Sequence, residues 1–124
     1  MSTPNITPSE WEVMKLLWRK SPQTSAEVVK TLSETTSWTP KTIRTLFNRL
    51  VAKDALAFEQ VGRVYYYSPI VEEKDCAVAE ALSFLQRIYD GAFESMLANF
   101  LDAQVLSEAE IEKLKQIIDE KGKK

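Results

Sequence analysis

The sequence has no histidine, a single cysteine and only three glycines among its 124 residues. Without histidine the chain lacks the most frequent general base and the commonest ligand of catalytic zinc. The single cysteine, Cys76, excludes an intramolecular disulfide and the cysteine sets of structural zinc sites. No glycine-rich loop that could cradle a phosphate is present either. These absences argue against an enzyme, and we expect no catalytic residue, no bound metal and no cofactor.

Long apolar runs are also missing. No stretch approaches the roughly 20 apolar residues that a helix needs to cross a bilayer. The first residues lack the basic and apolar segments of a signal peptide, so we expect a cytoplasmic protein without membrane insertion. A content of 44% apolar and 27% charged residues is typical of a globular protein.

The net charge of −2 conceals an asymmetry along the chain. Residues 1–70 contain nine cations and six acids, a net charge of +3, whereas residues 71–124 contain seven cations and twelve acids, a net charge of −5. A basic half joined to an acidic half is typical of a nucleic-acid-binding module linked to a module with another role.

Residues 39–50 show two helical stripes that point in opposite directions. The apolar stripe consists of Ile43, Leu46, Phe47 and Leu50. The polar stripe consists of Lys41, Arg44, Thr45 and Asn48. The stripes are offset by two residues, about 200° around a helix, so one can pack on a core while the other faces a partner. Thr39 is a candidate N-cap and Pro40 suits the first helical position.

The character of the polar stripe distinguishes it from an ordinary solvated helix face. Such faces mix charges of both signs, but no carboxylate occurs between Lys41 and Lys53. Cations, hydroxyls and amides are the groups that bind phosphates and base edges. We therefore predict a DNA-recognition helix, although amphipathicity by itself is common to all surface helices.

The segments around this helix predict a winged helix-turn-helix. Capping boxes at Thr7 and Thr24 begin two earlier helices, and alternating strands at 56–60 and 63–68 flank Val61-Gly62 as a hairpin. We expect a mainly α fold with a small β-hairpin and a winged-helix DNA-binding domain over residues 1–70. Arg63, at the hairpin tip, is a candidate phosphate contact. Alternation along Tyr65–Tyr67 indicates that at least one tyrosine belongs to the core.

Residues 71–124 predict three amphipathic helices, with Gly91 after the first and a capping box at Ser107 before the last. An isolated segment of about fifty residues forms a marginal core, so we expect a helical dimerisation domain shared by two chains. The expected dimer core consists of Leu82, Leu85, Phe93, Leu97, Phe100 and Ile118. Cys76 lies among small apolar residues, which favours a packing role over a redox role.

Several segments together resemble the penicillinase repressor family, which includes penicillinase, methicillin-resistance and copper-responsive repressors. They are Glu10-Trp11-Glu12-Val13-Met14, Trp38-Thr39-Pro40-Lys41-Thr42-Ile43-Arg44-Thr45-Leu46, Asn48-Arg49-Leu50, Tyr66-Tyr67-Ser68 and Val71-Glu72-Glu73. The resemblance covers nearly the whole chain in the same order. It implies a homodimeric winged-helix repressor of a palindromic double-stranded DNA operator with TACA/TGTA-type half-sites.

The resemblance also implies roles for particular residues. By matching positions, Lys41, Thr42, Arg44 and Thr45 would contact DNA from the recognition helix and Arg63 from the hairpin. The residue pattern itself adds Asn48, on the polar stripe, and the cation Arg49 to the expected DNA-binding residues. The C-terminal cysteine cluster of the copper-responsive members is absent, which favours the β-lactam-resistance branch. In that branch a regulatory protease inactivates the repressor at an Asn-Phe bond, and Asn99-Phe100 occupies the corresponding place.

Two alternatives remain open on the sequence. One is a metal- or redox-responsive repressor, because two Cys76 thiols from a dimer could meet. The other is a winged-helix module that binds protein instead of DNA, although such modules usually lack a cationic face free of acids.

Overall fold

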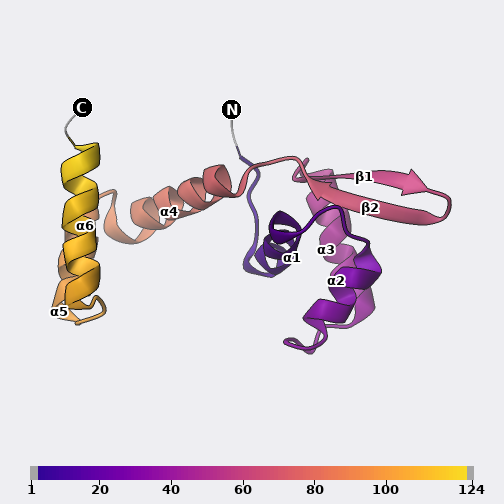
Figure 1. The fold of residues 1–124 in the computed structure, drawn as a ribbon, viewed down its shortest axis with the longest axis horizontal. Coiled ribbons are helices and arrows are strands. Elements are labelled where there is room, and N and C mark those ends of the chain that lie inside the picture. The colour runs from indigo at the N-terminus through magenta and orange to yellow at the C-terminus, as the bar shows by residue number, and fades with distance from the viewer. Residues whose placement is uncertain (1–2, 123–124) are drawn as a thin grey trace. The chain divides into compact units, whose positions relative to one another are not determined.

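The structure is a computed structural model that describes residues 3–122. Six helices and one two-stranded antiparallel sheet follow each other along this part of the chain (Figure 1). The elements are α1 (Pro8–Arg19), α2 (Ser25–Leu32), α3 (Pro40–Ala52), β1 (Leu56–Val61), β2 (Val64–Pro69), α4 (Glu73–Tyr89), α5 (Phe93–Asp102) and α6 (Glu108–Lys121). The chain forms two compact units, residues 1–80 and 81–124, with the division inside α4.

The helices of the first unit begin where local side chains satisfy their free amides. The hydroxyls of Thr7, Thr24 and Thr39 each accept a hydrogen bond from the amide three residues later. Glu10 and Glu27 complete two of these caps by accepting from the backbone amides of Thr7 and Thr24. The three helix starts predicted from the sequence are therefore confirmed.

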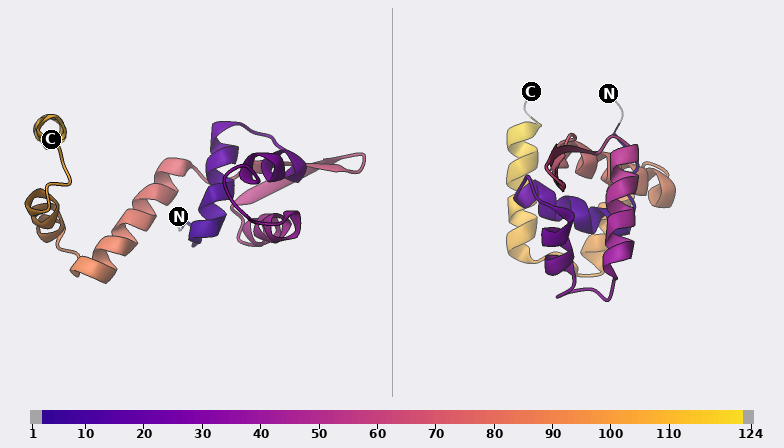
Figure 2. Two further views of the ribbon diagram at one scale, coloured as in Figure 1. Left: turned by 90° about the horizontal axis from the view of Figure 1, so that it is seen from below. Right: turned by 90° about the vertical axis from the view of Figure 1, so that its right-hand side faces the viewer.

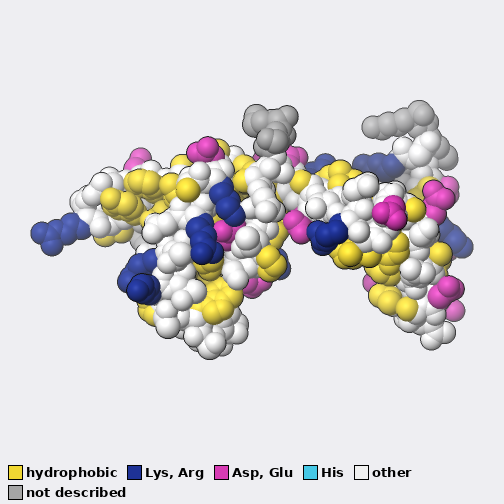
Figure 3. Space-filling view, turned by 180° about the vertical axis from the view of Figure 1, so that it is seen from behind, with side chains coloured by type: hydrophobic (Ala, Val, Ile, Leu, Met, Phe, Trp, Pro, Cys, Tyr) yellow, Lys and Arg dark blue, Asp and Glu magenta, His cyan; other side chains and the backbone are white. Residues whose placement is uncertain are grey.

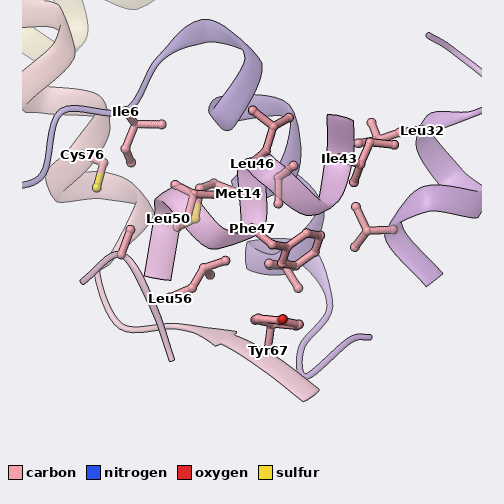
Figure 4. Close-up of a cluster of buried hydrophobic side chains, with 14 residues drawn as sticks. Ile6, Met14, Leu32, Ile43, Leu46, Phe47, Leu50, Leu56, Tyr67 and Cys76 are labelled. Atoms are coloured by element: carbon pink, nitrogen blue, oxygen red, sulfur yellow. The ribbon is translucent and has the colours of Figure 1, made fainter. Parts of the chain in front are cut away.

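The core of the first unit lies where α1, α2, α3 and the hairpin meet (Figure 4). Val13, Met14 and Leu17 of α1 are fully buried, and the apolar stripe of α3 is buried against them. The Phe47 ring of α3 faces the Tyr67 ring of β2, with their centres 4.5 Å apart. Because the apolar stripe of α3 is buried, its polar stripe must face outward.

The hairpin has a two-residue turn, Gly62-Arg63, since Val61 pairs with Val64. Gly62 has a φ of +64°, which suits the first central position of a type II′ turn. Arg63 thus lies in the turn and not in the second strand, where the alternating pattern had placed it. The hairpin extends beyond the helices of its own unit (Figures 1 and 2).

A single bridge joins the hairpin to the segment between α1 and α2. The backbones of Gln23 and Tyr67 exchange hydrogen bonds of 3.1 and 2.8 Å. The Gln23 side chain donates to the carbonyls of Leu16 and Lys20, at 3.1 and 2.7 Å. Gln23 therefore terminates α1 and anchors the base of the hairpin.

The second unit consists of the end of α4 together with α5 and α6. Asp90 and Gly91 adopt positive φ after α4, and Ser107 caps α6 as its capping box predicted. Within residues 81–122 no side chain is fully buried, and several large apolar side chains are exposed. No described helix is both long and apolar enough to cross a membrane.

Candidate nucleic-acid interface

The outward face of α3 carries every polar residue predicted to contact DNA on this helix. All six side chains are exposed, whereas the intervening apolar positions are buried. They are Lys41, Thr42, Arg44, Thr45, Asn48 and Arg49. The first turn of α3 contains no acidic residue, so the partial positive charge of the helix N-terminus adds to that of the side chains.

Hydrogen bonds fix two hydroxyls on this face. The Thr39 hydroxyl donates to the Thr42 hydroxyl at 3.1 Å, and it also accepts from the Thr42 amide at 3.2 Å. The Thr45 hydroxyl donates to the Lys41 carbonyl at 3.0 Å. The threonine oxygens keep acceptor capacity and the methyl groups remain exposed, which suits contact with base edges.

The cations of α3 and the hairpin have no acidic partner within the described chain. Between residues 3 and 122, ion pairs form at Lys15–Glu12, 4.0 Å apart, and at Lys53–Glu10. Lys41, Arg44, Arg49 and Arg63 take part in neither. Figure 3 shows basic side chains gathered over the first unit and at the end of its hairpin. Four unneutralised cations on one unit are an attractive surface for a polyanion.

Lys53 does not belong to this surface, although it ends the acid-free stretch that begins at Lys41. Its ammonium group donates to the Glu10 carboxylate and to the Asn5 carbonyl, the latter at 2.7 Å. The pair joins the end of α3 to the start of α1. Lys53 therefore stabilises the fold, and its charge is neutralised before any DNA arrives.

Glu10 is fully buried, which ordinarily disfavours the charged form of a carboxyl group. Burial raises its pKa, but hydrogen bonds from Lys53 and from the Thr7 amide outweigh that effect, so the pKa of Glu10 lies below its ordinary value. Sequence spacing identified Glu10 only as half of a capping box. Its second partner could not be found that way because Lys53 lies 43 residues further along the chain.

The structure places the other predicted residues in the second unit and at the start of α4. Leu82, Phe93 and Ile118 are strongly exposed in the single chain, and the remaining predicted dimer residues, Leu85, Leu97 and Phe100, are half-buried. Asn99 lies on the exposed side of α5, and its amide donates to the Tyr89 hydroxyl at 3.4 Å.

Cys76 lies in the core of the first unit, next to Ile6 (Figure 4). Burial, with the charge of Asp75, raises the pKa of the thiol, so the reactive thiolate is disfavoured. The described residues include no cluster of acidic, cysteine or histidine side chains that could hold a metal ion.

Two adjoining helices, an exposed acid-free face on the second of them, and a basic hairpin tip define a winged-helix DNA-binding protein. A family model described as penicillinase repressor matches residues 6–120. The chain belongs to the penicillinase repressor family.

Individual relatives support the same assignment over nearly the full length. The penicillinase repressor of Bacillus licheniformis is 44% identical over 117 residues, covering 94% of this chain and 91% of that protein. The methicillin resistance regulatory protein MecI of Staphylococcus aureus (strain N315) is 34% identical over 119 residues, covering 96% and 97%.

Two solved structures are similar to part of this chain. The solution structure of the DNA-binding domain of the repressor BlaI has 45% identity and a TM-score of 0.55, covering 60% of this chain and 93% of that one. The solution structure of the monomeric form of B. licheniformis BlaI in complex with the blaP half-operator has 44% identity and a TM-score of 0.53, covering 60% and 90%. The expected mainly α winged-helix fold is confirmed. Family membership confirms that the chain is a transcriptional repressor and not an enzyme.

Proposed function

We propose that this repressor binds a palindromic operator as a homodimer, with α3 in the major groove and the hairpin tip on the DNA backbone. The observation that carries the proposal is the exposed face of α3, which holds cations, hydroxyls and an amide but no carboxylate. The similarity of this chain to a repressor in complex with a half-operator supports the same arrangement. One recognition helix per chain reads one half-site, so two chains read a palindrome.

The division of labour along α3 follows from side-chain chemistry. Arg44 and Asn48 have planar groups that suit bidentate contacts with guanine and adenine, and Thr45 suits a thymine methyl group. Lys41, Thr42 and Arg49 suit phosphates at the groove edge, as does Arg63 at the hairpin tip. The operator half-sites proposed from the resemblance are of TACA/TGTA type.

Dimerisation is assigned to residues 71–124. The second unit leaves Leu82, Phe93 and Ile118 more than half exposed in the single chain. Exposure of these apolar side chains to water is unfavourable, and burial against a second copy of the chain removes it. Leu85, Leu97 and Phe100 complete the proposed dimer core.

Repression would end by cleavage of the Asn99-Phe100 bond by a regulatory protease. The bond lies within α5, so α5 must open locally before a protease can bind it in extended form. Cleavage removes α6 and the end of α5 but leaves the residues proposed to contact DNA intact. The genes under control would be β-lactam resistance genes, in keeping with the curated relatives.

Binding measurements on two arginine variants test the proposal. Arg44→Ala should weaken operator binding by about 1–3 kcal/mol and relax preference at one base pair, whereas Arg63→Ala should weaken operator and scrambled duplexes alike. If three or four cations per chain meet phosphates, log K against log salt should have a slope of roughly −5 to −7 for the dimer. A slope near zero would refute DNA binding.

A further inference from the structure

A row of aromatic rings leads from the core of the first unit out along the hairpin. The Phe47 ring lies 4.5 Å from Tyr67, which lies 5.9 Å from Phe58. Phe58 stacks on Tyr65 with the ring centres 4.7 Å apart and the planes 1° from parallel. The inner rings are buried, but Phe58 is 46% exposed and Tyr65 is 39% exposed.

Stabilisation of the hairpin accounts for the stacked rings but not for the Tyr65 hydroxyl. Aromatic pairs across strands stabilise a hairpin, and phenylalanine at position 65 would supply the same stacking. No residue between 3 and 122 forms a hydrogen bond with the Tyr65 hydroxyl. Because Tyr65 is 39% exposed and its hydroxyl has no partner among these residues, the hydroxyl is available to a binding partner.

The register of the hairpin places this hydroxyl on the face without acidic residues. Gln60 pairs with Tyr65, whereas Glu59 pairs with Tyr66 on the opposite face. The Tyr65 face is also the one that packs on α3, through the contact of Tyr67 with Phe47. A polyanion that approaches α3 and the hairpin tip therefore meets Tyr65 before it meets Glu59.

We infer that Tyr65 is a further DNA contact, whose hydroxyl donates a hydrogen bond to a backbone phosphate beside the one bound by Arg63. Phe58 is a positioning residue, because its stacked ring holds the phenol in place. The contact positions the hairpin relative to the DNA backbone and does not distinguish one base sequence from another. This inference rests on the proposed DNA-binding function.

The test is Tyr65→Phe in the full-length chain, which removes the hydroxyl and keeps the stacked ring. The probes are a duplex with paired TACA/TGTA half-sites and a scrambled duplex of equal length. We expect a loss of about 3–10-fold in affinity for both. The slope of log K against log salt should stay unchanged, since a neutral donor releases no counterion, whereas Arg63→Ala should make the slope shallower.

Tyr66→Phe is the matched control, because that ring lies on the face shared with Glu59. It should bind both duplexes like the unchanged protein. Equal binding by Tyr65→Phe and the unchanged protein would overturn the inference and leave the proposed function standing. A loss confined to the half-site duplex would overturn the phosphate assignment. Failure of the unchanged protein to bind either duplex would instead overturn the proposed function, and the inference with it.

Discussion

At the scale of single residues, the Lys53–Glu10 pair shows how packing gives a charged side chain a structural role. Glu10 is fully buried, and one of its carboxylate oxygens has no hydrogen-bond partner among the described residues. The other oxygen accepts from Lys53 and from the Thr7 amide. A buried carboxylate that depends on one ammonium group makes that ammonium structurally important.

Replacing Lys53 with methionine should therefore destabilise the protein strongly. The substitution keeps the length of the side chain but leaves Glu10 buried without its counter-charge, which should cost about 2–4 kcal/mol of unfolding free energy. Lys15→Met is the matched control, because the Lys15–Glu12 pair is about half exposed and contributes less than about 0.5 kcal/mol. Urea denaturation measures both; equal losses would contradict the assignment.

Because the pKa of Glu10 is lowered, the unfolding free energy of the protein depends on pH in the acidic range. Because the pKa lies below the ordinary value of 4.5, the stabilisation is complete above that pH and disappears as the pH falls through the folded-state pKa. The unfolding free energy of the unchanged protein should exceed that of Glu10→Gln by a constant amount near neutral pH. Below about pH 4.5 the difference should shrink. Denaturation across a pH series checks this, and a difference independent of pH would contradict it.

At the scale of elements, the end of α1 and the base of the hairpin are held by one side chain. Gln23 donates to the carbonyls of Leu16, in the last turn of α1, and of Lys20, its C-cap, while its backbone pairs with Tyr67. Helix ends leave several carbonyls without partners inside the helix. Gln23 donates to the Lys20 carbonyl and is a second donor to the Leu16 carbonyl, which also accepts from the Lys20 amide. The residue thus links helix termination to sheet formation.

Gln23→Leu should keep the volume of this side chain but remove both donors. We expect a loss of about 1–3 kcal/mol, since the Lys20 carbonyl loses the Gln23 donor and the Leu16 carbonyl keeps only the Lys20 amide. Gln60→Leu is the control, because the Gln60 amide donates to Gly62 at an exposed turn and its loss should cost less than about 0.5 kcal/mol. Thermal unfolding of both variants measures the difference; an unchanged midpoint for Gln23→Leu would refute the capping role.

At the scale of the whole molecule, the first unit has a buried core while the second has none within residues 81–122. The second unit nevertheless forms three helical segments, the end of α4, α5 and α6, of which α6 begins with a capping box at Ser107. Their exposed apolar side chains are the physical basis for the proposed dimer.

A double variant, Leu82→Ser with Ile118→Ser, separates a monomer from a dimer. Both side chains are at least 60% exposed in the single chain, so a monomer should tolerate the change. In a dimer, four apolar side chains lose their burial, and the dissociation constant should rise by at least about 10²-fold. Val61→Ser, at an exposed site on the hairpin, is the control. Sedimentation measures the assembly, and an unchanged profile for the double variant would contradict the proposed core.

Removal of residues 100–124 should mimic the proposed cleavage. Residues 1–99 retain all of the first unit and every residue proposed to contact DNA, but they lose α6 and the end of α5. Because the second half-site is no longer bound within the same complex, operator affinity should fall by about 10²–10⁴-fold. Sedimentation and binding to a palindromic duplex check this. A truncated chain that stays dimeric and binds at full strength would exclude the mechanism.

Local signals in the sequence determined the elements of this protein and which face of α3 is exposed. Thr39 and Pro40 define the start of α3, and the spacing of its apolar residues decides which side is buried. Gly62 marks the turn of the hairpin to within one residue. These features depend on neighbours three or four positions apart, so the sequence alone reveals them.

Only the tertiary structure determined which cations lack an acidic partner and which aromatic rings are exposed. Lys53 has the same local pattern as the cations of α3, yet it pairs with Glu10 because packing brings the end of α3 to the start of α1. Alternation could not tell which of Tyr65 and Tyr67 is buried; the reach of α3 covers Tyr67 and leaves Tyr65 exposed. Contacts between distant segments depend on how the elements pack, and spacing along the chain does not record them.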